Sequence, residues 1–217
     1  MRGVVLLLAA GEGTRLGCGP KGFVELNGVP LVRRAAEAAS AAALVDRLVV
    51  AVPAGRTADA SSVLRDLAAE VVEGGASRQS SAARAIEAAG GCDAVAVHDA
   101  ARAMCPADLF DRCLSALDDA DAVIPALPAR DTLKETSDDL VVRTLDRSRI
   151  VVVQTPQAFR AVVYRDALAA AQREGVEATD DAALVERLGI AVRVIEGDER
   201  NLKITTAEDL RIAEALL

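Results

Sequence analysis

Short apolar runs alternate with segments of helical periodicity along most of the chain. Strands are predicted at Val4 to Leu8, Leu48 to Val52, Glu70 to Glu73, Asp93 to His98, Ala122 to Ala126 and Ile190 to Glu196. Helices are predicted over 30–43, 57–69, 106–117 and 161–173, with further helices ending at Ala89 and Leu188 and a terminal one capped by Thr205 to Glu208. Continuous apolar strands alternating with helices are typical of a mostly parallel sheet covered on both faces. The pattern therefore predicts one α/β domain spanning residues 1–217.

The segment from about 130 to 149 departs from this pattern. Apolar and polar residues alternate there on both sides of a polar turn, Ser137-Asp138-Asp139, which is typical of a β-hairpin. The hairpin has too little apolar surface to join the main core, and an isolated two-stranded hairpin is only marginally stable in water. We predict a protruding arm that packs on another subunit and forms a homodimer. The alternative is a mobile flap over the chain's own site.

Composition excludes several classes of partner. The 217 residues carry a net charge of −8 with a pI near 4.8, which argues against nucleic acids and membrane surfaces. No apolar run approaches the roughly 18 residues of a membrane span, and Met1-Arg2 leads into the first strand rather than a signal peptide. The four cysteines show no C-x-x-C spacing, so we expect reduced thiols in the cytoplasm and no zinc site.

A glycine-rich loop follows the first strand. It reads Gly11-Glu12-Gly13-Thr14-Arg15-Leu16-Gly17-Cys18-Gly19-Pro20-Lys21. Glycines let backbone N–H groups approach a phosphate closely, and Arg15 and Lys21 add positive charge. Since only three of the 25 basic residues are lysines, Lys21 is favoured as a functional residue rather than surface filler. An ordinary strand-to-helix turn is the alternative.

The loop does not match the two common phosphate-binding motifs. The dinucleotide fingerprint requires glycine where Leu16 stands. A P-loop requires Gly-Lys-Ser/Thr opening a helix, whereas Lys21 follows a proline and precedes Gly22. The remaining pattern, Gly-x-Gly-x-Arg with Pro-Lys, resembles nucleotidyltransferases that activate sugars and polyols.

Two other segments could extend this site. The stretch from Gly74 to Ser81 places paired glycines before a helix N-terminus that carries Ser77 and Arg78. Such a helix N-terminus could bind an anion or a ribose. A plain helix cap explains Ser77 equally well. Ligands of open α/β sheets bind beyond the carboxyl ends of strands, so Asp99 and Arg102 should lie near the glycine-rich loop.

His98, at the end of the same strand, is the chain's one histidine. It is a candidate base, but a lone histidine at a strand end is more often structural. Asp99 is the better candidate, either near a Mg²⁺ held by a triphosphate or bonded to substrate hydroxyls.

The whole set of motifs resembles the 2-C-methyl-D-erythritol 4-phosphate cytidylyltransferase family of non-mevalonate isoprenoid biosynthesis. The matching motifs are Leu8-Ala9-Ala10-Gly11-x-Gly13-x-Arg15, Pro20-Lys21, Gly74-Gly75-x-x-Arg78-x-x-Ser81, Val97 to Arg102, Arg130 to Lys134, Asp146-Arg147, Thr155-Pro156-Gln157, Thr179-Asp180 and Asn201 to Thr205. The first motif marks only the broad superfamily, whereas the ordered set is specific. Two positions depart from the family pattern. Ala76 stands where the family often has an acidic residue, and this departure weakens the expectation of a base or ribose contact there. Ala103 stands where proline is usual.

The resemblance implies a Rossmann-like nucleotidyltransferase fold and a reaction between CTP and a polyol phosphate. The polyol's phosphate would attack the α-phosphorus of CTP, with Mg²⁺ held mainly by the CTP phosphates and no metal ligands from the protein. By resemblance, the transition state is stabilised by Arg15 and Lys21, and the attacking phosphate is held by Arg147 and Lys203. The resemblance also implies that the polyol phosphate is contacted by Asp99, Arg102, Thr132, Thr155 and Thr179. It implies that CTP is contacted by Leu8, Ala9, Ala10, Gly11, Gly13, Gly75 and Ser81.

Two alternatives remain open from the sequence. One is a cytidylyltransferase for ribitol 5-phosphate, which resembles this chain along most of its length and would differ in the polyol pocket. The other is a non-catalytic nucleotide-binding or regulatory domain on the same fold, since fold does not fix function. Retention of Arg15, Lys21 and Lys203 together argues against the second alternative.

Overall fold

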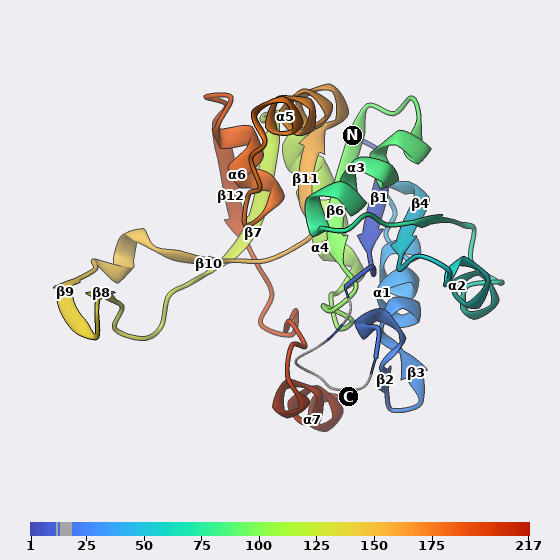
Figure 1. Ribbon diagram of the computed structural model, residues 1–217, viewed down its shortest axis with the longest axis horizontal. Helices are drawn as coiled ribbons and strands as arrows, with labels where there is room; N and C mark the ends of the chain where they lie inside the picture. Colours follow the sequence, from blue (N-terminus) through green and yellow to red (C-terminus); the bar gives the residue numbers. More distant parts are fainter. Residues whose placement is uncertain (12, 14–18) are drawn as a thin grey trace.

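The computed structural model describes residues 1–11, 13 and 19–217 (Figure 1). Its central sheet has eight strands, seven of them in the order β10-β7-β11-β6-β1-β4-β5, with β12 paired to β7. The strands are β1 (Gly3–Leu8), β4 (Val45–Val52), β5 (Ala69–Glu73), β6 (Ala94–Asp99), β7 (Ala122–Pro128), β10 (Val151–Val153), β11 (Gln157–Arg160) and β12 (Val192–Glu196). The predicted mostly parallel α/β sheet is confirmed.

β1 lies at the centre of the sheet, parallel to both β4 and β6. All six of its residues are buried, because helices cover both faces of the sheet. β5, predicted as a strand at Glu70 to Glu73, pairs with β4 and stands at the end of the strand order, so it forms an edge of the described sheet. The antiparallel strand β11, between β6 and β7, was not predicted, because four residues with two apolar side chains give no distinctive pattern.

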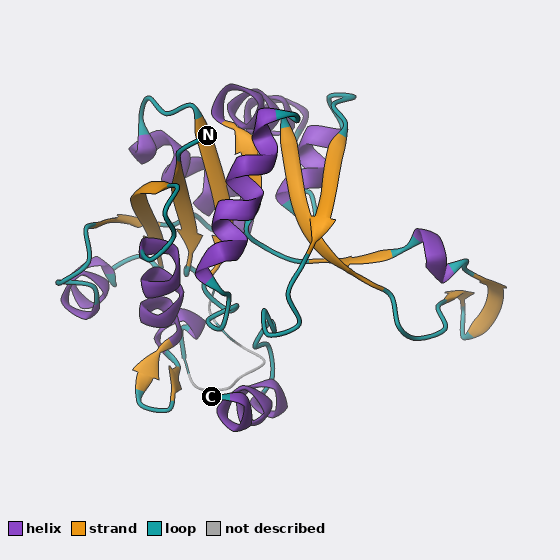
Figure 2. Cartoon of the chain, turned by 180° about the vertical axis from the view of Figure 1, so that it is seen from behind, coloured by secondary structure: helices purple, strands orange, loops and turns teal. Residues whose placement is uncertain are grey.

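Helices pack on the sheet in two layers (Figure 2). One face is covered by α1 (Leu31–Ser40), α2 (Thr57–Val63) and α4 (Ala107–Ser115), and the other by α3 (Arg78–Ala89), α5 (Ala161–Glu174) and α6 (Asp181–Glu186). Alternate residues of β1 enter the two cores: Val5 and Leu7 one, Val4 and Leu6 the other. None of the helices in the described part of the chain has the length and apolar character needed to span a membrane.

A smaller cluster lies beside the sheet. The terminal helix α7 (Ala207–Leu216) packs through Ala213 on the short hairpin of β2 (Glu25–Leu26) and β3 (Val29–Pro30). This hairpin was missed, although its turn is Asn27-Gly28, the strongest short hairpin signal, with positive φ at both residues.

Several predicted boundaries were wrong. The helix predicted over 57–69 ends at Val63, because Ala69 already belongs to β5. The helix predicted through Leu188 ends at Glu186. The terminal capping box lies one residue later than predicted and joins Thr206 to Asp209.

The predicted hairpin arm is present. β8 (Lys134–Ser137) and β9 (Leu140–Thr144) pair antiparallel, and all nine of their residues are exposed. The turn residues Asp138 and Asp139 both have positive φ. Figures 1 and 2 show the arm extending away from the sheet. Its role in a dimer stays a prediction.

Candidate functional site

A cavity of about 760 Å³ opens where four neighbouring parallel strands end. β1 delivers Leu8, β4 is followed by Pro53, β5 by Gly74, and β6 ends at Asp99. This is the edge at which open α/β sheets bind ligands. The described lining residues are Leu8, Ala9, Ala10, Gly11, Gly13, Lys21, Gly22, Pro53, Ala54, Gly74, Gly75, Ala76, Ser77, Arg78, Ser81, Arg84, Asp99, Ala100, Ala101 and Lys203.

The predicted nucleotide contacts therefore lie together. Leu8, Ala9, Ala10, Gly11, Gly13, Gly75 and Ser81 all line the cavity, as do Lys21, Asp99 and Lys203. Arg15 lies outside the described residues. Ala76 also lines the cavity, so this departure from the family pattern faces the site.

Glycines bring two loops into contact at the cavity wall. A Cβ on Gly74 would lie 2.5 Å from the Ala10 Cβ and 2.8 Å from the Ser81 Oγ, so only glycine lets this segment approach the loop after β1. The Gly75 N–H donates to the Ser81 Oγ at 3.0 Å. Ser77 caps α3 in a capping box with Ser80, which confirms the helix-cap interpretation. Ser77 also lines the cavity, and its contact with an anion or a ribose stays a prediction.

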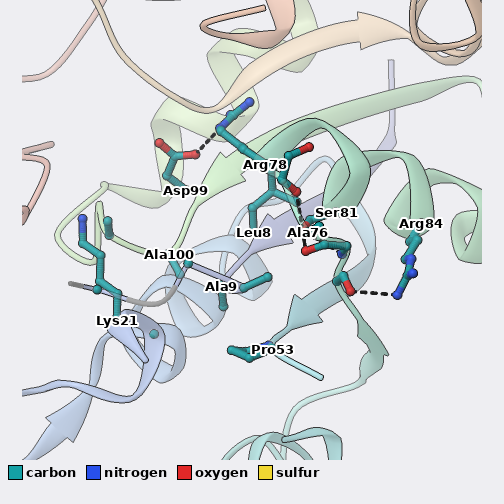
Figure 3. Close-up of a pocket in the computed structure, with 18 of the residues that line it drawn as sticks. Leu8, Ala9, Lys21, Pro53, Ala76, Arg78, Ser81, Arg84, Asp99 and Ala100 are labelled. Carbon is teal, nitrogen blue, oxygen red and sulfur yellow. Dashed lines mark hydrogen bonds and ion pairs between the residues drawn. The ribbon is translucent and has the colours of Figure 1, made fainter. Parts of the chain in front are cut away.

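Charged side chains converge on Asp99, which is the one acidic side chain among the described lining residues. Its Oδ1 accepts from the Arg78 Nε at 3.0 Å, and its Oδ2 pairs with the Lys203 Nζ at 2.7 Å. Burial would raise the pKa of Asp99, but Arg78 and Lys203 outweigh that effect and hold it well below its usual value. Figure 3 shows Asp99 beside Arg78.

His98 and Thr155 lie beneath this group rather than in the cavity. Thr155 Oγ1 lies 3.0 Å from the His98 Nδ1 and accepts from the backbone N–H of Asp99 at 3.1 Å. Burial is the largest influence on His98 and lowers its pKa to about 4. His98 is therefore neutral near pH 7 and holds the end of β6. Thr155 contacts the backbone of Asp99, and its predicted contact with the substrate stays a prediction.

Arg102 does not line the cavity. It is buried, and it donates to the backbone oxygens of Asn201 at 2.8 Å and Val153 at 3.2 Å. In this chain it therefore ties the segment after β6 to the segment before α7. Its predicted contact with the polyol stays a prediction.

The remaining predicted residues lie elsewhere on the chain. Thr132 and Arg147 belong to the arm region and are exposed, and the Arg147 Nη1 donates to the Arg130 oxygen at 2.5 Å. Thr179 is exposed just before α6. One copy of the chain does not bring these three into the cavity, and their substrate contacts stay predictions.

The sequence analysis missed several lining residues. Pro53 and Ala54 follow β4, so the same strand-end rule that located Asp99 would have found them. Arg84 lines the cavity one helical turn beyond Ser81 and donates to the Gly74 oxygen at 2.8 Å. Spacing of three along α3 was the available signal for Arg84.

Comparisons with known proteins agree with this geometry. The family model of 2-C-methyl-D-erythritol 4-phosphate cytidylyltransferase (IspD) matches residues 4–217. A bifunctional enzyme IspD/IspF of Nitratidesulfovibrio vulgaris is 45% identical over 99% of this chain, which spans 58% of that relative's length. The Nocardia farcinica 2-C-methyl-D-erythritol 4-phosphate cytidylyltransferase is also 45% identical, over 99% of this chain and 93% of its own.

Solved structures are similar along the whole chain. The 2-C-methyl-D-erythritol 4-phosphate cytidylyltransferase of Thermus thermophilus superposes with a TM-score of 0.85 at 38% identity, covering 100% of this chain and 98% of that one. The 4-diphosphocytidyl-2C-methyl-D-erythritol synthase of Anaerococcus prevotii gives 0.89 at 26% identity, over 98% and 94% of the two chains. The chain belongs to the 2-C-methyl-D-erythritol 4-phosphate cytidylyltransferase family.

Proposed function

We propose that the protein transfers the cytidylyl group of CTP to 2-C-methyl-D-erythritol 4-phosphate and releases pyrophosphate. The observation that carries this proposal is the lining of one cavity by Lys21, from the glycine-rich loop, and by Lys203, from the segment before α7. Although the net charge of the protein is −8, positive side chains line this cavity beside its glycine-rich wall. Such a site suits a triphosphate and a second phosphate.

The chemistry needs positioned charge more than a base. A phosphate oxygen of the polyol phosphate attacks the α-phosphorus of CTP, the bond to the bridging oxygen of the β-phosphate breaks, and pyrophosphate leaves. Because the nucleophile is already an anion at neutral pH, a neutral, buried His98 is no obstacle. Two anions must be brought together, and the charge that develops on the transferring group must be stabilised. Lys21 and Arg15 would stabilise this charge, while Lys203 would hold the attacking phosphate.

The residues fit a Mg²⁺ held mainly by CTP. Among the described residues there is no group of three or more His, Cys, Asp or Glu side chains that could hold a metal ion, and both oxygens of Asp99 already face cations. Mg²⁺ usually keeps several waters and binds substrate phosphate oxygens, so the CTP phosphates would be its main ligands. When bound, it would supply positive charge to the triphosphate oxygens.

A homodimer is part of the proposal. Leu140, Val141 and Val142 are adjacent in the arm and 58–73% exposed, and a second subunit would cover them. Thr132 and Arg147 would then complete the partner's cavity. We place the enzyme in the cytoplasm, which agrees with the free thiols of Cys92, Cys105 and Cys113 in the described part of the chain.

Pyrophosphate release with CTP and Mg²⁺ against a panel of polyol phosphates tests the proposal. We expect turnover with 2-C-methyl-D-erythritol 4-phosphate. Turnover of ribitol 5-phosphate about tenfold faster would overturn the substrate assignment, since about 1.4 kcal/mol in the barrier corresponds to a tenfold preference. CTP binding without release from any polyol phosphate would identify a non-catalytic nucleotide-binding domain.

A further inference from the structure

A series of polar contacts runs from the buried face of the sheet to the cavity. Tyr164 donates its hydroxyl to the Asp181 Oδ1 at 2.5 Å, and the Asp181 Oδ2 accepts from the Arg78 Nη1 at 2.6 Å. Arg78 then reaches Asp99 through its Nε at 3.0 Å, and Asp99 reaches the Lys203 Nζ at 2.7 Å. The five residues come from α5, α6, α3, β6 and the segment before α7.

The inner end of this series is rigidly held. Tyr164 and Asp181 are 0% and 1% exposed, and the Tyr164 ring stacks on Phe159 with centroids 4.9 Å apart. Burial raises the pKa of Asp181, and Arg78 and the Tyr164 hydroxyl partly offset this effect by stabilising the carboxylate. A buried charge pair is costly to break, because one charge would be left without a partner in a dry environment.

The outer end is held through its backbone, since Asn201 and Ile204 are both 0% exposed and the Ile204 N–H donates to the Ala101 oxygen at 2.8 Å, but its side chain is not enclosed. The Lys203 side chain is 43% exposed, and its segment, 201–205, is neither helix nor strand. An ammonium group on four rotatable bonds takes its position from its partners. Asp99 is the carboxylate partner that holds it, using one of the three N–H donors and leaving the others for a phosphate.

We propose that Arg78 is a positioning residue for the transfer reaction: by bridging Asp181 and Asp99 it fixes where the Lys203 ammonium meets the attacking phosphate. The inference rests on the proposed function. Arginine suits this role because its planar guanidinium donates to two carboxylates through separate N–H groups in fixed directions. A lysine would keep the charge but lose this fixed double contact.

Arg78→Lys tests the proposal in two backgrounds. In the otherwise unchanged enzyme we expect kcat/KM for the polyol phosphate to fall about tenfold, at the scale of coupling between residues in one network. The CTP dissociation constant, measured by calorimetry, should change less than about threefold, because Lys21 and the glycine wall are untouched. In an Asp99→Asn background the contact with Lys203 is already weakened. Adding Arg78→Lys to that background should lower kcat/KM for the polyol phosphate only slightly further.

Arg33→Lys is the matched control. Arg33 on α1 also bridges two carboxylates, those of Glu37 and Asp66, but it does not line the cavity. The same substitution there should leave kcat/KM within about twofold of the wild type, because neither Glu37 nor Asp66 lines the cavity and both carboxylates are about half exposed. A loss equal to that of Arg78→Lys would mean that the effect is a general loss of stability, which would overturn the proposal.

Tyr164→Phe provides a second route should Arg78→Lys not fold. It removes one hydroxyl outside the cavity, and we expect a smaller loss of the same kind, in kcat/KM for the polyol phosphate and not in CTP affinity. Equal factors for Arg78→Lys in both backgrounds, or a loss confined to CTP affinity, would overturn the positioning role while leaving the proposed function intact. A wild-type enzyme without transfer activity would instead overturn the proposed function itself.

Discussion

Single residues decide where positive charge stands in the cavity. Lys21 ends the glycine-rich loop and lines the cavity proposed to hold the triphosphate. Lys21→Ala should lower kcat by about 10² or more, the scale of losing one donor aimed at charge that develops in the transition state. CTP affinity should change far less. Arg15→Ala should have the same two effects, a large loss of kcat and a small change in CTP affinity. Steady-state kinetics and calorimetry measure the two quantities. A collapse of CTP affinity with kcat preserved at saturation would show that Lys21 binds the ground state only.

The close packing around Gly74 leads to a second prediction for a single residue. A Cβ there meets both the Ala10 Cβ and the Ser81 Oγ below 3 Å, so Gly74→Ala must push apart the two loops that form the wall. We expect CTP affinity to fall about tenfold, since roughly 1.4 kcal/mol lies within the cost of overpacking. Gly91→Ala is the control, because a Cβ at Gly91 has no neighbour within 4 Å. Equal CTP dissociation constants for the two variants, by calorimetry, would contradict this account of the wall.

At the N-terminus of the terminal helix α7, the hydrogen bonds of Asp209 can be tested for their contribution to stability. The Asp209 carboxylate accepts from the hydroxyl of Thr205 and from the backbone N–H groups of Thr205 and Thr206. Hydrogen bonding to Thr205, outweighing burial, lowers the pKa of Asp209 to about 2. Asp209→Ala should reduce the free energy of unfolding by about 1 kcal/mol at pH 7, as for loss of a helix cap.

The pH dependence of this cap has a definite sign. Because the folded pKa of Asp209 is depressed, its contribution is complete above the unfolded value of 3.8 and is lost as pH falls toward 2. Urea titrations of wild type and Asp209→Ala should therefore converge between about pH 4 and 2. Glu208→Ala is the control, since Glu208 is exposed and, among the described residues, its ion pair is with Arg211. A larger cost for Glu208→Ala would support the capping box predicted from sequence instead.

Elements were predictable where their pattern was local. Apolar runs located β1, β4 and β6, and the strand-end rule brought Asp99 to the glycine-rich loop. β11 could not be predicted, because its antiparallel insertion depends on pairing with β6 and β7 rather than on its own four residues. The bridge from Arg78 to Asp181 was equally inaccessible, since it joins positions 103 residues apart that meet only because α3 and α6 pack on the same face of the sheet.

At the scale of the whole molecule, the arm is the feature that one chain leaves unexplained. Its nine strand residues are all exposed, and a two-stranded hairpin gains little stability alone. The predicted site residues Thr132 and Arg147 belong to the arm region and do not line the cavity of their own chain. A two-fold dimer would account for both facts, because each arm could then reach the cavity of the other subunit.

Subunit mixing tests this shared site. Lys21→Ala and Arg147→Ala homodimers should each be nearly inactive. In a heterodimer, one site would carry both changes and the other neither, because Lys21 and Arg147 of one site come from different subunits. Random reassociation of equal amounts makes half of the dimers mixed, so about a quarter of wild-type activity should return. If Arg147 served the cavity of its own chain, every site would keep one change. Subunit exchange shown by mass spectrometry without recovered activity would therefore favour the arm as a flap over its own site.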